Sequence, residues 1–189
     1  MHSLAAFGKA FPGIRIVVVL APGLFDSWQD LCRQFGPVPA HELAEGGATR
    51  FHSVIAGLHR VEDEGFTAIH DAARPLVTPA LIRAMFRTAE QHGCCIPAIA
   101  VTESVRIVGN EGSLPFDRDR LRMIQTPQVF RSDLIRAACR QPFHERFTDD
   151  ATVAEGFGAF IHLGEGDQRN LKITRPGDLA LAEALLAGG

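Results

Sequence analysis

The chain has 189 residues, a length typical of one domain with a hydrophobic core of normal size. Hydrophobic residues make up 46% of the sequence and charged residues 22%, a globular balance that excludes a disordered chain. The net charge of −3 gives no electrostatic support for binding nucleic acid or an acidic membrane, and no apolar run approaches the roughly 18 residues of a membrane span.

Predicted helices and buried strands alternate through the first half of the chain. The run IRIVVVL (14–20) is nearly continuous in β-branched residues, which is typical of a strand covered on both faces. Between Thr49 and Val61 the apolar residues recur at helical spacing. In chain order the sequence predicts a helix at 1–11, a strand at 14–20, a helix ending near 35, a short strand at 38–41, a helix at 49–61, a strand at 66–69, a helix at 79–92 and a strand at 96–101.

Residues 102–125 interrupt this alternation. SVRIV and LRMIQ read as two strands separated by the turn-rich GNEGS, an excursion from the main sheet. Strands that alternate with amphipathic helices predict an α/β fold with a parallel sheet. After the excursion the sequence predicts a helix at 131–140, a helix beginning near Thr148, a strand at 159–164, a short strand at 171–173 and a helix that has Pro176 in its first turn.

Asp71 and Arg74 directly follow the strand at 66–69, in the stretch HDAARP. Ligands of open α/β sheets bind beyond the carboxyl ends of the strands, so these two residues are candidates for a site. A carboxylate there suits Mg²⁺, and an arginine suits phosphate because its planar fork can donate two hydrogen bonds. The alternative is an ion pair that pins a loop, and the spacing leaves both open. His70 is expected to pack rather than react.

The stretch EGGATRFHSV (45–54) also has two interpretations. Its glycine pair allows a ligand to approach the backbone closely, and Thr49 can cap a helix whose amino end favours anions. A glycine pair before a helix is, however, most often only a turn.

In FTDDATVAE (147–155), Thr148 is the expected N-cap, with Asp149 and Asp150 in the first turn of the helix. Capping by itself explains both acids. Lys172 is expected within a strand, where it faces either solvent or a phosphate.

The four cysteines and eight histidines form no recognisable metal or disulfide pattern. The adjacent Cys94 and Cys95 are expected to pack in the core. A reduced, cytoplasmic enzyme is therefore expected.

The order of five motifs is more specific than any one of them. GGATRFHSVIAGL, HDAARP, TPQVF, TDDA and NLKITRPGDLALAE together resemble the 2-C-methyl-D-erythritol 4-phosphate cytidylyltransferase family of the non-mevalonate isoprenoid pathway, from residue 1 to about residue 187. The resemblance implies a single Rossmann-like domain of the nucleotide-diphospho-sugar transferase type: a mostly parallel twisted sheet, flanking helices and a protruding β-arm at 102–125 that embraces a second subunit of a homodimer. It also implies attack of a phosphomonoester oxygen on the α-phosphorus of CTP, with release of pyrophosphate.

The resemblance implies roles for individual residues as well. Asp71 binds Mg²⁺ beside the phosphates of CTP, while Arg118 and Lys172 position the sugar phosphate, and these three form the implied catalytic set. The other implied contacts are Gly46, Gly47, Arg50, Ser53 and Ala72 to the nucleotide, and Arg74, Ser104, Thr126 and Thr148 to the polyol phosphate.

One departure from the family pattern is large. Family members open with a strand and a glycine-rich loop that carries an arginine and then Pro-Lys-Gln, and MHSLAAF resembles the helix that follows that loop. The chain is thus expected to begin roughly 35 residues late, a length that contains a whole strand at about 3.3 Å per residue. We expect the 189 residues to be unstable or inactive without that segment. Two smaller departures are Ala48, where many relatives carry an acid, and the shorter hydroxyl of Ser104.

Three rival interpretations follow from these residues. The first is ribitol-5-phosphate cytidylyltransferase, which performs the same chemistry on another polyol phosphate. The second is a non-catalytic remnant that dimerises and binds a phosphorylated sugar. The third, a generic nucleotide-sugar binding module, fits the sheet but not the pair Arg118 and Lys172.

Overall fold

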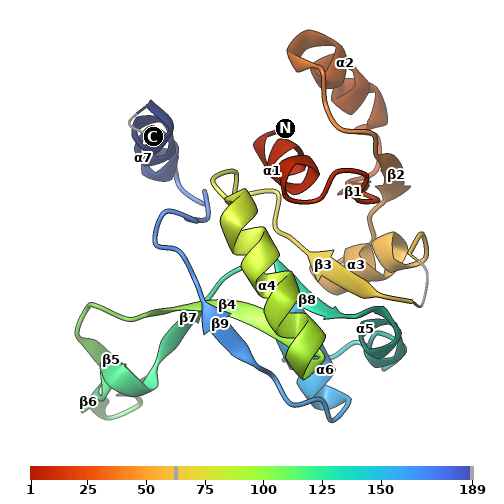
Figure 1. The fold of residues 1–189 in the computed structure, drawn as a ribbon. Coiled ribbons are helices and arrows are strands. Elements are labelled where there is room, and N and C mark those ends of the chain that lie inside the picture. The colour runs from red at the N-terminus through yellow and green to blue at the C-terminus, as the bar shows by residue number, and fades with distance from the viewer. Residues whose placement is uncertain (62–63, 188–189) are drawn as a thin grey trace.

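The computed structural model describes residues 1–61 and 64–187. Within them, helices and strands alternate along most of the chain (Figure 1). In chain order the elements are α1 (His2–Ala10), β1 (Val17–Leu20), α2 (Phe25–Phe35), β2 (Glu42–Glu45), α3 (Arg50–Leu58), β3 (Phe66–Ile69), α4 (Pro79–His92), β4 (Cys94–Ala100), β5 (Val105–Gly109), β6 (Gly112–Phe116), the 3-10 helix η1 (Arg118–Arg120), β7 (Arg122–Ile124), β8 (Gln128–Arg131), α5 (Ser132–Ala138), α6 (Asp150–Gly156), β9 (Leu163–Glu165) and α7 (Pro176–Ala187).

The strands form a mixed sheet rather than the mostly parallel sheet that the sequence predicts. β3, β8, β4 and β7 lie in that order, and β9 pairs with β4. β3, β4 and β9 share one direction, whereas β7 and β8 run antiparallel to them. The chain returns from the excursion directly along β4, and antiparallel neighbours need no crossover helix. The α/β class is confirmed. The antiparallel strands are β7, which the sequence places in the excursion outside the main sheet, and β8, for which the sequence predicts no strand.

β1 and β2 form a separate parallel pair. Within the described residues, β1 has β2 as its one strand partner and β3 has β8, so each of these strands leaves its other edge without a strand.

Three local predictions are wrong. The strand expected at 38–41 lies instead at β2, because Pro39 has no N–H to contribute to a ladder. Residues 171–173 form no strand, since the N–H of Ile173 donates to the carbonyl of Ala73 in the loop after β3. The strand β8 is absent from the sequence-based prediction.

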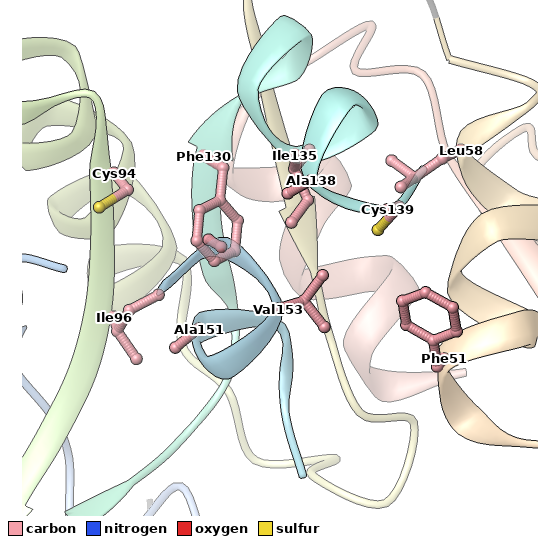
Figure 2. Packing of buried hydrophobic residues seen from close by; sticks show 11 residues of the cluster. Phe51, Leu58, Cys94, Ile96, Phe130, Ile135, Ala138, Cys139, Ala151 and Val153 are labelled. Atoms are coloured by element: carbon pink, nitrogen blue, oxygen red, sulfur yellow. The ribbon is translucent and has the colours of Figure 1, made fainter. Parts of the chain in front are cut away.

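Helices cover both faces of the sheet, and the strands alternate their side chains between two cores. Figure 2 shows the first core, in which Phe130 of β8 and Ile96 of β4 pack with residues of α3, α5 and α6. Val129 and Cys95, the neighbouring residues along those two strands, point into the second core with α1 and α4. Two-residue alternation of this kind is what a strand buried on both faces requires. The described part of the chain contains no helix that is both long and apolar enough to cross a bilayer.

The excursion at 102–125 is an arm, but its pairing differs from the prediction. β5 and β6 form an antiparallel hairpin that projects away from the body (Figure 1). The second predicted strand, LRMIQ, supplies β7, which pairs with β4 in the main sheet. The hairpin exposes Ile107, Val108 and Leu114.

Candidate active site

The candidate site lies at the carboxyl ends of β2 and β3, which belong to separate sheets, and beside the start of β8. Gly46 follows β2, and Asp71 comes two residues after β3. β8 runs antiparallel to β3 with Gln128 opposite Ile69, so Thr126, which precedes β8, lies beside the end of β3. This is the edge at which α/β sheets bind ligands.

Asp71 is surrounded by three cations from distant parts of the chain. Its Oδ2 atom lies 2.9 Å from Nζ of Lys172 and 3.9 Å from Nε of Arg74, and its Oδ1 atom lies 3.4 Å from Nε of Arg50. Partial burial opposes ionisation of Asp71, but the hydrogen bond from Lys172 and the charge of Arg50 lower its pKa below the usual value. The carboxylate therefore stays charged at neutral pH, and the predicted residues Asp71 and Lys172 share one site.

Arg74 is buried and holds the loop. Its Nη1 atom donates to the carbonyl of Asn170 at 2.8 Å, and its Nη2 atom donates to the carbonyl of Ile124 at 3.3 Å. These bonds connect the loop after β3 to β7 and to the segment that carries Lys172. The sequence leaves two roles open for Arg74, binding of phosphate and pinning of a loop. The hydrogen bonds of Arg74 in the structure are those that pin the loop.

A polar network fixes the backbone of Asp71. Nε2 of His70 lies 3.1 Å from the carbonyl of Arg74, which only accepts, so Nε2 carries the proton. Burial lowers the pKa of His70 to about 4 against the hydrogen bonds that favour protonation. The ring is therefore neutral, and Nδ1 accepts from the hydroxyl of Thr126 at 3.1 Å. That hydroxyl in turn accepts from the N–H of Asp71 at 3.0 Å.

Thr126, assigned to the polyol phosphate by resemblance, is thus buried with its hydroxyl hydrogen engaged. The expectation that His70 packs rather than reacts agrees with this geometry.

The amino end of α3 is built around the glycine pair. Thr49 caps the helix by accepting from the N–H of His52, as predicted. A Cβ at Gly47 would lie 2.4 Å from Cβ of His52, and one at Gly46 would lie 2.9 Å from Oγ of Ser53, so these positions take no larger residue without rearrangement. The N–H of Gly47 donates to Oγ of Ser53 at 3.2 Å.

The two acids of TDDA have different roles: Asp150 lies in the first turn of α6, as predicted, but the predicted N-cap is wrong by one residue. Asp149, not Thr148, is the N-cap of α6, and it forms a capping box with Thr152. Asp150 is buried, and its two oxygens accept from Nη1 and Nη2 of Arg50 at 3.0 and 2.6 Å. Capping accounts for the first acid only. A helix start needs only one capping acid. The second acid, Asp150, is therefore the sequence signal that could have indicated a cationic partner such as Arg50.

Asn170 and Gln125 are further residues that sequence reasoning misses. Nδ2 of Asn170, which is fully buried, donates to the carbonyl of Thr126 at 2.9 Å. Nε2 of Gln125 donates to the carbonyl of Asp167 at 2.8 Å. Gln125 and Asn170 thus connect the start of β8 to residues 167–170. This segment ends two residues before Lys172. Neither residue has a sequence signal beyond its place in a motif.

The remaining predicted residues are exposed on the surface. Arg118 is exposed in η1 at the base of the arm, where Nη1 donates to the carbonyl of Thr102. Ser104, at the start of the arm, and Thr148, before α6, are exposed, as is Ala72 beside Asp71. The structure therefore brings Asp71, Lys172, Arg50, Arg74 and Thr126 together, while the contacts described for Arg118 are with the arm.

The cluster carries a net positive charge, since three cations face the two carboxylates Asp71 and Asp150. Such a site suits phosphate groups. A cavity of about 540 Å³ between α6 and the loop that precedes it is lined by none of the predicted site residues in the described chain: its lining residues are Gln141, Pro142, Phe143, His144, Arg146, Phe147, Thr152 and Gly156.

The chain was compared with known proteins. The model of the 2-C-methyl-D-erythritol 4-phosphate cytidylyltransferase family matches residues 1–188. A protein of that name from Bacteroides thetaiotaomicron is 42% identical over 186 residues, which cover 98% of this chain and 85% of the relative. Another from Porphyromonas gingivalis (strain ATCC 33277) is 43% identical over 187 residues, with 98% and 83% covered. The crystal structure of the cytidylyltransferase from Thermus thermophilus has a TM-score of 0.80 and 30% identity, and the match covers 98% of this chain and 87% of that one.

Proposed function

Because the chain belongs to the 2-C-methyl-D-erythritol 4-phosphate cytidylyltransferase family, we propose that it transfers the cytidylyl group of CTP to 2-C-methyl-D-erythritol 4-phosphate. The products are CDP-methylerythritol and pyrophosphate. The observation that carries this proposal is the contact of 2.9 Å between Lys172 and Asp71, which come from distant motifs and meet at the carboxyl end of β3.

The reaction requires positioning and charge neutralisation more than it requires a protein nucleophile. A phosphate oxygen of the polyol phosphate forms a bond to the α-phosphorus of CTP, and the bond from that phosphorus to the bridging oxygen breaks as pyrophosphate leaves. Fixed cations lower the barrier because negative charge builds on the phosphates in the transition state. Lys172 and Arg50 are the cations best placed to act on phosphates at Asp71, and Arg118 is the predicted third.

Asp71 is the residue that would hold a divalent cation. In the described residues, no group of three or more His, Cys, Asp or Glu could hold a metal ion by itself. One ionised, mostly buried carboxylate nevertheless fits Mg²⁺, which commonly binds one or two carboxylates and completes its shell with water and substrate phosphates. When bound, the ion neutralises phosphate charge. Asp71 would hold such an ion beside the triphosphate, and Lys172 would bind the phosphate of the second substrate.

We also propose that the arm formed by β5 and β6 embraces a second copy of the chain. Its exposed apolar residues support this, since Val108 is 80% exposed and Leu114 is 73% exposed on a hairpin that projects from the body. Exposed apolar residues on a projecting hairpin are typical of an interface between proteins.

The experiment offers 2-C-methyl-D-erythritol 4-phosphate and ribitol 5-phosphate separately, each with CTP and Mg²⁺, and measures release of pyrophosphate. In a version that also carries the opening strand and glycine-rich loop of the family pattern, we expect turnover with the methylerythritol compound and strong loss in Asp71→Asn. If the protein prefers ribitol 5-phosphate, that compound is the substrate and the assignment of 2-C-methyl-D-erythritol 4-phosphate is wrong. Binding of the polyol phosphate by calorimetry, without binding of CTP and without turnover, would identify a non-catalytic protein instead.

A further inference from the structure

Arg50 joins two carboxylates that lie far apart in the sequence. Its Nη1 and Nη2 atoms donate to the two oxygens of Asp150, which lies 100 residues later, at 3.0 and 2.6 Å. Its Nε atom points to Oδ1 of Asp71 at 3.4 Å. All three nitrogens of the guanidinium are therefore directed at a carboxylate, so the orientation of the group is fixed in its plane.

The two carboxylates differ in exposure. The side chain of Asp150 is 3% exposed and that of Asp71 is 15% exposed. Burial raises the pKa of Asp150, although Arg50 opposes this shift. Burial likewise opposes the charge of Arg50, but the hydrogen bonds and charges of Asp150 and Asp71 together outweigh it and raise the pKa of the guanidinium. Asp150 thus holds the guanidinium of Arg50 on its buried side, and Asp71 contacts the same guanidinium on the more exposed side of the site.

The three cations around Asp71 are held to different degrees. Arg74 is locked by the carbonyls of Asn170 and Ile124, and Arg50 is locked by Asp150. Lys172 has a side chain that is 44% exposed, and within the described residues its ion pair is with Asp71. A lysine ammonium on a flexible stem can exchange one oxygen ligand for another, whereas a bidentate arginine cannot do so without losing both bonds.

We propose that Asp150 is a positioning residue: it fixes Arg50 against Asp71, so that Arg50 keeps its place in the nucleotide site while Lys172 exchanges Asp71 for a ligand phosphate. This inference rests on the proposed function for the identity of the ligand. The orientation of Arg50, however, is a property of the chain itself and can be measured without any substrate.

The first test observes Arg50 directly by NMR of the arginine side chains. A guanidinium held by two in-plane hydrogen bonds rotates slowly about its Nε–Cζ bond and gives separate Nη signals, and Arg50→Lys identifies the signals that belong to it. We expect Asp150→Asn to merge them. The matched control is Asp149→Asn, which neutralises the neighbouring acid but retains a good N-cap. Resolved Arg50 signals in Asp150→Asn overturn the proposal.

The second test is a double-mutant cycle on binding of CTP with Mg²⁺. Asp150→Asn is expected to raise the dissociation constant about tenfold or more, and to change it less than about twofold when Arg50→Gln is already present. Equal effects in both backgrounds would mean that Asp150 acts on the fold generally, and would overturn the positioning role.

A third variant covers the case in which Asp150→Asn does not fold. Arg50→Lys leaves Asp150 paired with a cation but removes the fork, so it is expected to fold and to bind CTP about tenfold or more weakly. Affinity equal to that of the unmodified protein overturns the proposal. If none of the proteins binds CTP, the proposed function fails while the NMR measurement still decides the role of Asp150.

Discussion

Lys172 and Asp71 illustrate how far single residues can be predicted. Motifs indicate both, and both lie in one cluster, with Nζ and Oδ2 2.9 Å apart. For Asp150 the sequence favours capping, because a helix start explains an acid locally, and its true partner, Arg50, lies 100 residues away. Local patterns predict residues whose chemistry is set by neighbours in sequence. They do not predict a buried partner that tertiary packing supplies.

Substitution of Lys172 should separate the two substrates. Because this side chain is 44% exposed, Lys172→Ala should cost little folding free energy, consistent with the small contribution of exposed ion pairs. We expect the KM for the polyol phosphate to rise about tenfold or more and the KM for CTP to change much less. The control is Arg175→Ala, which removes another exposed cation nearby. Equal losses for both substrates would contradict the assignment of Lys172 to the sugar phosphate.

His70 should make the folded state sensitive to mild acid. Burial lowers the pKa of this ring from 6.5 to about 4. As the pH falls below 6.5, His70 therefore binds a proton in the unfolded chain but stays neutral in the folded chain. The contribution of neutral His70 is complete above pH 6.5 and is lost as the pH falls toward 4. At a pH of about 5 the loss should be about 2 kcal/mol.

Urea unfolding at pH values of about 7.5 and about 5 measures this difference, and His70→Gln is the comparison variant. The drop in unfolding free energy between the two pH values should be smaller in the variant. If the drop is the same in both proteins, titration of His70 does not control acid stability.

At the scale of elements, the turn-rich sequence reveals the arm but does not give the pairing of its strands. GNEGS reads as the whole loop, whereas β6 begins at Gly112 within it and continues through SLPF. Pro115 within this strand weakens the pattern, yet it is tolerated because a two-stranded hairpin consists of edge strands. Strand β8 escapes prediction because only four residues, Gln128–Arg131, separate the TP dipeptide from the next helix.

The arm gives a test of the proposed dimer. Val108→Asp places a charge on the most exposed apolar residue of the hairpin, which is 80% exposed. We expect sedimentation to show monomers at concentrations where the unmodified chain is dimeric, with unchanged circular dichroism. Asn110→Asp adds the same charge at the hairpin turn without removing apolar surface, and it should remain dimeric. A dimer that persists in Val108→Asp would exclude the arm as the principal contact.

At the scale of the whole molecule, the α/β class is predictable because it depends on the alternation of hydrophobic periods along the chain. The direction of each strand cannot be predicted from this alternation, because it depends on whether the chain crosses over the sheet or turns back beside it. The two sheets, β1–β2 and the sheet that begins at β3, each end at an edge with no strand partner in the described residues. An edge of this kind is open to pairing with a further strand.

The hydroxyl of Thr126 has a consequence for motion. It joins the amide of Asp71 to the ring of His70, and the carbonyl of Asn170 is joined in turn to Arg74 of the same loop. This oxygen atom therefore adds a side-chain link between the start of β8 and the loop after β3, beside the ladder pair of Ile69 and Gln128. The isosteric change Thr126→Val would remove that link and leave the motion of the Asp71 loop less tightly coupled to the start of β8.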